Sequence, residues 1–284
     1  MTLYIEVLVF GALLGLPFLY ETRPAFCYCL KFLVYYAVVM LNSVILIPVF
    51  LLRPWSVFNL VIASYFCRWI THLIGVKWEL RNGEILEPQE PCIIVSNHQS
   101  SLDILGMFQI WSTMGRCTVI AKKELFWAWP FGMAAWLAGL VFIPRVKTKA
   151  EQAKAVINEA VEKVAQEKTK LWIFPEGTRR NTGEIHPFKK GAFHSAISAQ
   201  LPVIPVVFSN YYFLDRPNKK FDQGVVIVKV LEPLSTKGLT LDDVEKFTDL
   251  VYEKMSQAFH QINKEALIHR ESSKHSASNF TLLK

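Results

Sequence analysis

A histidine and an aspartate lie five residues apart, at the point where an apolar run gives way to a helical pattern. The run, residues 92–95, is short, mostly β-branched and preceded by proline, which predicts a buried strand. His98 follows this strand, and Asp103 falls in the first turn of the next helix, where the helix dipole favours a carboxylate. Ser100 or Ser101 could cap that helix. The histidine and the aspartate are therefore expected to point into one cleft.

An aspartate beside an imidazole fixes the imidazole tautomer and stabilises the imidazolium, so the free nitrogen can take a proton from a hydroxyl near neutral pH. This pair is two thirds of a hydrolytic triad, but the sequence contains no GxSxG nucleophile elbow. The hydroxyl of an acceptor molecule could take the place of the serine. The alternative is that Asp103 only caps a helix and His98 is an ordinary strand-end histidine.

A second apolar run, residues 171–174, breaks at a proline into a polar loop. That loop carries four candidate site residues: Glu176, Gly177, Thr178 and Arg179. The glycine permits a tight turn, which presents the threonine and the arginine from a strand end, where ligands of α/β folds gather. The planar guanidinium of an arginine can bind phosphate oxygens through two parallel hydrogen bonds. The alternative is a surface salt bridge between the glutamate and a neighbour.

Four blocks follow one another along the chain: NHQSSLD at 97–103, GLVFIPR at 139–145, FPEGTR at 174–179 and LPVIPV at 201–206. Together with AKKELFWAWPFG and PFKKGAFHSA, they resemble the glycerolipid acyltransferase family, and within it the animal 1-acylglycerol-3-phosphate (lysophosphatidic acid) acyltransferases. The resemblance extends from about residue 55 to about residue 262. Pro144 is a departure, because many relatives carry an acidic residue at this position.

The resemblance implies a reaction and a role for each candidate residue. An acyl group would pass from acyl-CoA to the sn-2 hydroxyl of 1-acylglycerol 3-phosphate, giving phosphatidate and free CoA, with no bound cofactor and no metal. His98 would take the hydroxyl proton, Asp103 would orient His98, and Arg179 would hold the acceptor phosphate. Residues 176–178 would shape the loop. Two further basic residues are candidates for binding phosphate or CoA: Lys123 and Arg145.

Three other functions are compatible with short motifs. Relatives of this family acylate glycerol 3-phosphate or lysophospholipids with larger headgroups, and the blocks separate these acceptors poorly. A lipid-binding or membrane-scaffolding protein on an inactive acyltransferase fold would not need an oriented base. A lipid hydrolase would use water in place of the acceptor alcohol.

The composition indicates contact with a membrane. The chain of 284 residues is 52% hydrophobic, which leaves apolar segments beyond the needs of one core. Its net charge of +7 suits anionic lipid headgroups, CoA or nucleic acid. No zinc finger, RNA-recognition signature or basic helix occurs, which argues against nucleic acid. The five cysteines are odd in number and lie in apolar settings, so they are interpreted as reduced.

Membrane-anchoring helices are expected in residues 1–53, followed by an interfacial helix at 54–75. Residues 32–52 are uncharged and long enough to cross a bilayer, although a hairpin within one leaflet is an alternative. Three basic residues lie on the side of the catalytic domain: Arg53, Arg68 and Lys77. The positive-inside tendency makes that side cytosolic. The resemblance adds the endoplasmic reticulum as the expected membrane.

Residues 125–144 are also uncharged, yet they are not expected to cross the membrane. A crossing would separate His98 and Arg179, which belong to one site. We interpret the segment as interfacial and core structure that returns as a strand at 139–144 and could form an apolar groove for an acyl chain. Its tryptophans suit the headgroup region, and the alternative is that they belong to the core: Trp127, Trp129 and Trp136.

The catalytic domain is assigned to residues 76–268. Residues 76–89 read as a polar, hairpin-like link, and 269–284 as a disordered tail. Between them strands alternate with helices, the clearest helices covering 148–170 and 241–266. This alternation predicts an α/β fold, a mixed sheet flanked by helices.

Overall fold

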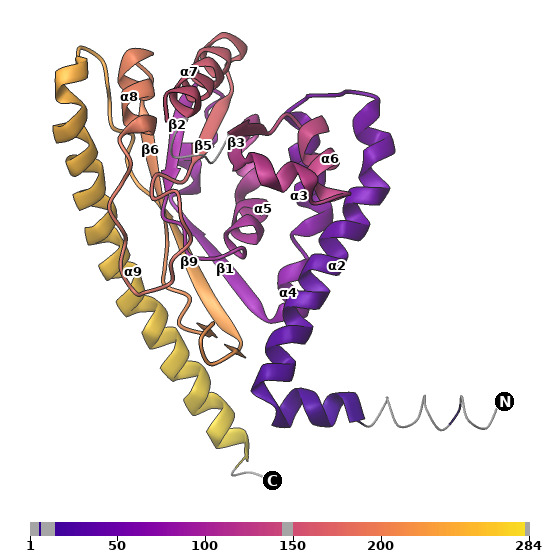
Figure 1. The fold of residues 1–284 in the computed structure, drawn as a ribbon. Coiled ribbons are helices and arrows are strands. Elements are labelled where there is room, and N and C mark those ends of the chain that lie inside the picture. Colours follow the sequence, from indigo (N-terminus) through magenta and orange to yellow (C-terminus); the bar gives the residue numbers. More distant parts are fainter. Residues whose placement is uncertain (1–5, 7–14, 144–149, 282–284) are drawn as a thin grey trace.

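The protein is described by a computed structural model that covers residue 6 and residues 15–143 and 150–281. The described residues contain a seven-stranded sheet with helices on both faces (Figure 1). Its strands are β1 (Val76–Arg81), β2 (Cys92–Ser96), β3 (Cys117–Lys122), β4 (Val141–Ile143), β5 (Lys170–Ile173), β6 (Val203–Phe208) and β9 (Gly224–Val230). The short strands β7 (Leu214–Asp215) and β8 (Lys220–Phe221) form a separate hairpin.

The strand order is β1-β9-β6-β2-β5-β3-β4. Strands β6, β2, β5, β3 and β4 are parallel, whereas β9 runs antiparallel to β6 and parallel to β1. The expected mixed sheet is therefore confirmed. Because β2 and β5 are parallel neighbours, the two loops that carry the candidate site residues leave the same edge of the sheet.

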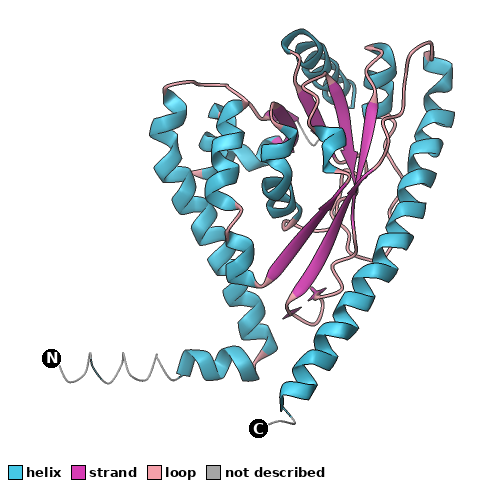
Figure 2. Ribbon diagram, turned by 180° about the vertical axis from the view of Figure 1, so that it is seen from behind, coloured by secondary structure: helices cyan, strands magenta, loops and turns pink. Residues whose placement is uncertain are grey.

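Helices cover both faces of the sheet (Figure 2). The larger helices are α2 (Pro24–Leu51), α3 (Phe58–Cys67), α5 (Asp103–Met114), α6 (Phe131–Leu137), α7 (Ala150–Glu167), α8 (Gly191–Ser198) and α9 (Val244–Thr281), with α4 (Ile70–Ile74) as a short one. Alternate side chains of β2 enter different cores: Ile94 packs with α5 and α2, while Ile93 and Val95 pack with α7, α8 and α9. All of β2 is buried, as its continuous apolar run predicts.

Two expectations about the catalytic domain differ from the structure. Residues 76–81 are not a hairpin-like link but the edge strand β1, whose partner β9 lies far along the chain. An edge strand needs little apolar sequence, which explains its polar appearance. The tail from residue 269 is not irregular, because α9 continues to Thr281. Neither glycine nor proline interrupts residues 267–281, so nothing in the backbone ends the helix earlier.

Residues 125–143 do not form a membrane span. They fold as the end of a 3₁₀ helix (Lys123–Trp127), then α6, then β4, which pairs with β3 at the edge of the sheet. The tryptophans of this segment are not core residues: Trp127 is 76% exposed and Trp129 is 70% exposed. Exposed aromatic rings at this density suit the headgroup region of a membrane.

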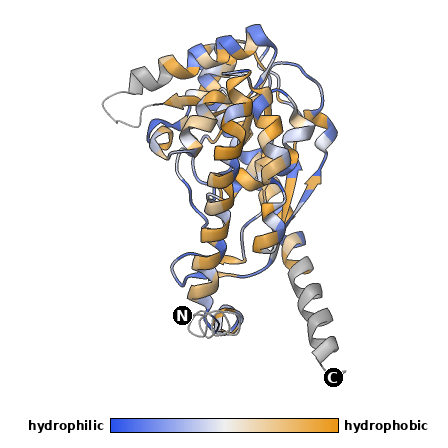
Figure 3. Ribbon diagram, turned by 90° about the vertical axis from the view of Figure 1, so that its right-hand side faces the viewer, coloured by the Kyte–Doolittle hydropathy of each residue, from blue (hydrophilic) through white to orange (hydrophobic). Residues whose placement is uncertain are grey.

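Helix α2 is long and apolar enough to cross a membrane, the one such helix in the part of the chain that the structure describes. It also packs along the catalytic domain (Figure 3). The hydroxyl of Tyr35 donates to the carbonyl of Ser101 at 2.9 Å, and the amide of Asn42 donates to the carbonyl of Phe66 at 3.1 Å. Only 28% of its most apolar 18-residue stretch is buried, so most of that stretch lies on the surface of the structure.

Candidate active site

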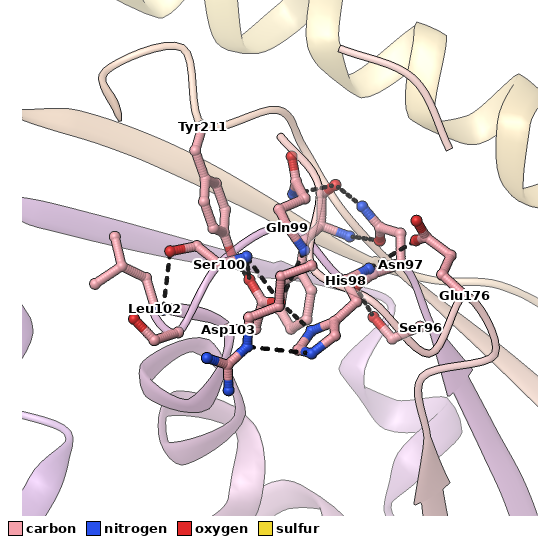
Figure 4. Close-up of polar contacts among 12 residues, drawn as sticks. Ser96, Asn97, His98, Gln99, Ser100, Leu102, Asp103, Glu176 and Tyr211 are labelled. Atoms are coloured by element: carbon pink, nitrogen blue, oxygen red, sulfur yellow. Dashed lines mark hydrogen bonds and ion pairs between the residues drawn. The ribbon is translucent and has the colours of Figure 1, made fainter. Parts of the chain in front are cut away.

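His98 and Asp103 are in direct contact at the carboxyl end of β2. The Nδ1 atom of His98 lies 2.6 Å from Oδ2 of Asp103, and the aspartate is fully buried (Figure 4). A carboxylate only accepts hydrogen bonds, so Nδ1 carries the hydrogen and Nε2 keeps its lone pair. The expected geometry of the pair is therefore present, and Nε2 is the nitrogen that can take a proton.

Four donors surround the buried carboxylate. Besides His98, Oδ2 accepts the backbone N–H of Gln99 at 2.9 Å, and Oδ1 accepts that of Ser100 at 3.1 Å. The hydroxyl of Tyr211 donates to Oδ1 at 2.8 Å. A buried charge is tolerated when its acceptor sites are filled in this way. Asp103 therefore orders the turn before α5 and orients His98. This is a larger role than that of a helix cap, which was the alternative interpretation.

The turn differs from the expectation in one detail. Neither Ser100 nor Ser101 caps α5; the N-cap is Leu102, which has no capping side chain. The first N–H groups of α5 donate instead to backbone carbonyls of the turn, that of Ile104 to Ser101 at 3.4 Å and that of Leu105 to Leu102 at 2.8 Å.

Sequence reasoning missed Tyr211 and Asn97. Tyr211 is fully buried in the loop after β6, where burial and then the Asp103 carboxylate raise its pKa well above the ordinary value. Asn97 exchanges two hydrogen bonds of 2.9 Å with the backbone of Phe208, which joins the ends of β2 and β6. Their partners lie more than a hundred residues away, as the separations of 108 and 111 show. No local pattern could have found them.

The loop after β5 holds His98 in place. The imidazole stacks on Phe174 with ring centroids 4.0 Å apart, and the backbone N–H of His98 donates to Oε1 of Glu176 at 2.8 Å. The carbonyl of His98 accepts the backbone N–H of Arg180 at 2.9 Å. The loop after β5 therefore fixes both the backbone and the imidazole ring of His98.

Glu176 is a structural partner of His98. The alternative, a surface salt bridge between Glu176 and a neighbour, is wrong, because the residue is only 8% exposed and accepts a backbone N–H. Burial raises the pKa of Glu176 to about 7, opposed by hydrogen bonds from the backbones of His98 and His186. The carboxylate is thus held by backbone donors on two segments of the chain.

Gly177 is required by the turn, as expected. Its φ is +67°, and its N–H donates to the carbonyl of Phe174 at 3.0 Å. A Cβ at this position would also lie 2.7 Å from the amine of Lys189. Thr178 and Arg179 follow as exposed residues, and Nε of Arg179 donates to Nε2 of His98 at 3.3 Å. The guanidinium therefore covers the lone pair that would take a proton.

The two weaker candidates do not join this network in the described structure. Lys123 is exposed after β3, and β5 separates that strand from β2 in the sheet. In the strand order, Lys123 therefore lies on the opposite side of β2 from β6. Arg145 lies outside the described residues, as does Pro144.

Chemically, this arrangement suits removal of a proton from a hydroxyl by Nε2 of His98, with Asp103 stabilising the resulting imidazolium. An anionic group on the same molecule could bind Arg179. In the described structure, the contacts of His98 given above are with Asp103, Phe174, Glu176, Arg179 and Arg180. None of these residues is a serine that could act as a nucleophile.

Comparisons with known proteins identify the family of the chain. Residues 77–209 match the family model described as Acyltransferase. The chain is 40% identical over 249 residues to human 1-acyl-sn-glycerol-3-phosphate acyltransferase alpha, covering 87% of each chain. It is 38% identical to the human beta enzyme, covering 89% of this chain and 91% of that one.

A solved structure supports the fold independently. The crystal structure of the 1-acyl-sn-glycerophosphate acyltransferase from Thermotoga maritima superposes with a TM-score of 0.61, covering 82% of this chain and 95% of that one. At 22% identity, this similarity bears on the fold alone. On the sequence matches, the chain belongs to the acyltransferase family that includes the 1-acyl-sn-glycerol-3-phosphate acyltransferases.

Proposed function

We propose that the protein transfers an acyl group from acyl-CoA to the sn-2 hydroxyl of 1-acyl-sn-glycerol 3-phosphate, producing phosphatidate and CoA. The observation that carries this proposal is the contact of Nδ1 of His98 with the buried Asp103, which leaves Nε2 as a base beside the guanidinium of Arg179. Identity of 40% to the human alpha enzyme supports the choice of acceptor.

In the proposed mechanism, the acceptor hydroxyl attacks the thioester carbonyl while Nε2 of His98 takes its proton. Asp103 stabilises the imidazolium through the 2.6 Å contact. Collapse of the tetrahedral intermediate breaks the carbon–sulfur bond, and the imidazolium returns the proton to the departing CoA thiolate. The base is neutral again at the end of the cycle, and no acyl-enzyme is formed.

Arg179 must move for this reaction to occur. Its Nε donates to the lone pair of His98 that the substrate hydroxyl needs. A phosphate is a stronger partner for a guanidinium than a neutral imidazole is, because both its oxygens and the arginine are charged. Acceptor binding would therefore draw Arg179 to the phosphate and open Nε2 to the hydroxyl.

The direct test incubates the purified protein with lysophosphatidate and labelled acyl-CoA. Equal amounts of phosphatidate and free CoA are expected. Consumption of acyl-CoA without an acylated lipid would instead support a hydrolase, and no consumption would support a lipid-binding protein. A panel that adds glycerol 3-phosphate and lysophosphatidylcholine with one acyl-CoA identifies the preferred acceptor.

Replacement of Arg179 by lysine should mainly affect the acceptor. Lysine keeps the positive charge but cannot bind a phosphate through two parallel hydrogen bonds as a guanidinium can. Losing one charge-assisted hydrogen bond costs about 1.5 to 3 kcal/mol, so the KM for lysophosphatidate should rise roughly tenfold to a hundredfold. The KM for acyl-CoA should stay nearly constant. Substrate titrations in mixed micelles measure both constants.

Arg180→Lys is the matched control, because Arg180 is exposed on the same loop and contacts His98 only through its backbone. It should leave both constants near wild type. If Arg179→Lys raised the acyl-CoA constant instead, Arg179 would belong to the donor phosphates. Lys123 or Arg145 would then be the acceptor candidates.

We further propose that the protein is held in the endoplasmic reticulum membrane with its catalytic domain facing the cytosol. The exposed apolar face of α2 and the exposed tryptophans support membrane contact, and the basic residues Arg53, Arg68 and Lys77 support the orientation. Tyr35 of α2 contacts Ser101 of the catalytic domain, and α6 of that domain packs against the same helix, whereas Asn42 contacts the interfacial segment through Phe66. This favours a helix that lies against the domain in one leaflet over a crossing helix that stands free of it.

The protein should stay with membranes after washing at high salt and at alkaline pH. Burial of the apolar face of α2 in lipid does not depend on charge screening, whereas attraction of a basic patch does. The measurement is the distribution between pellet and supernatant after each wash. Release by salt alone would show that the attachment is electrostatic.

A further inference from the structure

A cavity of about 710 Å³ opens beside Arg179, the residue that contacts His98, and is lined in part by the segment that follows β6. Three separate segments form its walls. The loop before α5 contributes Gln99, the loop after β5 contributes Arg179 and Asn181, and the segment 210–217 contributes Arg216. Helix α2 closes the remaining side with three aromatic residues: Tyr28, Phe32 and Tyr36.

Two guanidinium groups line this cavity. Arg179 comes from the loop that touches His98, and Arg216 is exposed between β7 and β8. The nearby carboxylate of Asp215 accepts the backbone N–H of Asn218 at 3.1 Å and its side-chain amide at 2.7 Å. That carboxylate is thus engaged within its own turn. Two arginines together suit a phosphate monoester, which carries between one and two negative charges at neutral pH.

The cavity wall also holds buried acceptors that no described residue satisfies. These are the side-chain carbonyl oxygens of Gln99, Asn181 and Asn210. Gln99 is only 7% exposed, and its amide nitrogen is already committed to the carbonyl of Ser209 at 2.9 Å. These three oxygens have almost no accessible surface even with the cavity empty, so they lie behind its lining, out of reach of a ligand. The lining itself carries polar side chains, including those of Ser100 and Thr182, which can hydrogen-bond the hydroxyl group of a glycerol phosphate unit.

The aromatic wall adds an apolar side to the same cavity. Tyr36 is anchored there, because its hydroxyl donates to Oγ of Ser101 at 2.9 Å, two residues before Asp103. Beyond these rings, α2 exposes a continuous apolar face, which includes Leu33, Leu41 and Ile45. An acyl chain that leaves the cavity along α2 would therefore remain in contact with apolar surface.

We propose that this cavity binds the glycerol phosphate end of the acceptor, with Arg216 as a second phosphate ligand beside Arg179 and α2 as the wall that receives the acceptor's acyl chain. This inference rests on the proposed function and deepens it. It makes α2 part of the substrate site as well as an anchor. The acceptor would reach His98 from the β6 side, which leaves the side of β3 and Lys123 for the donor.

The test compares Arg216→Gln with Lys219→Gln, which removes a charge from an exposed residue of the same loop outside the cavity. Arg216→Gln should raise the KM for lysophosphatidate by about tenfold or more, with turnover and the acyl-CoA KM changed less than about twofold. Lys219→Gln should match wild type. With uncharged 1-monoacylglycerol as acceptor, Arg216→Gln should have no effect, because there is no phosphate to bind.

Equilibrium binding of lysophosphatidate to each variant, without acyl-CoA, separates this inference from the proposed reaction. Weaker binding to Arg216→Gln supports the site even if no phosphatidate is formed by the wild type, and that result would overturn only the proposed function. Unchanged binding and an unchanged KM would overturn the site. A rise in the acyl-CoA KM would also overturn it, because the cavity would then hold the donor. Thermal unfolding of each variant checks that the exposed substitutions leave the fold intact.

Discussion

Replacing His98 with glutamine is expected to lower turnover by about 10²- to 10⁴-fold, the range that general-base catalysis typically contributes. Glutamine has a similar size and can still donate a hydrogen bond to Asp103, but its amide cannot take a proton near neutral pH. The groups proposed to bind the acceptor, Arg179 and Arg216, are unchanged. Both Michaelis constants should therefore stay near their wild-type values while turnover falls, as measured by titrating each substrate.

His98→Ala provides the second arm of this experiment. It also removes the stacking on Phe174 and the contact with Asp103, so it should lose turnover at least as strongly. Normal turnover by the purified His98→Ala protein would rule out His98 as the base. A large rise in either Michaelis constant with full turnover would make the histidine a binding residue instead.

The parts of the site that follow from local sequence were predictable. The apolar run of β2 ends in polar residues, and the helix that follows begins within a few residues, so the proximity of His98 and Asp103 depends on one short turn. Gly177 was predictable for the same reason, since a positive φ in a tight turn favours glycine. In both cases the interacting groups belong to one strand end and the loop after it.

The other parts depend on contacts between distant segments. The donor that Tyr211 supplies to Asp103 exists only because β6 lies next to β2, and the sheet order is not written in any local pattern. The same is true of the contact between Arg179 and His98, which the chain separates by 81 residues. Strand β1 was missed because its hydrogen-bond partner β9 comes about 150 residues later, and its own residues are those of a half-exposed edge.

Asp103→Asn should lower turnover further than any binding-residue change, on the order of 10⁴-fold, because it disturbs the tautomer of His98. Asparagine has one acceptor oxygen where the carboxylate has two. If its NH₂ group faces Nδ1 of His98, the imidazole must accept there and carry its hydrogen on Nε2, which removes the base. If the oxygen faces Nδ1, the tautomer is kept and the N–H of Ser100 still has that oxygen as an acceptor, but the imidazolium loses its counter-charge and the hydroxyl of Tyr211 loses its acceptor.

The thermal stability of Asp103→Asn shows whether its loss of turnover comes from the altered site or from unfolding of the protein. An unsatisfied buried donor costs about 1 to 3 kcal/mol, so thermal unfolding should move to a lower temperature while the protein remains folded. Tyr211→Phe is the matched control: it removes the 2.8 Å hydrogen bond to Oδ1 but leaves the charge and the tautomer in place. It should lose stability of the same order and far less turnover. If Asp103→Asn were destabilised like Tyr211→Phe and kept its turnover, Asp103 would only order the turn before α5, and His98 would have to act without a partner.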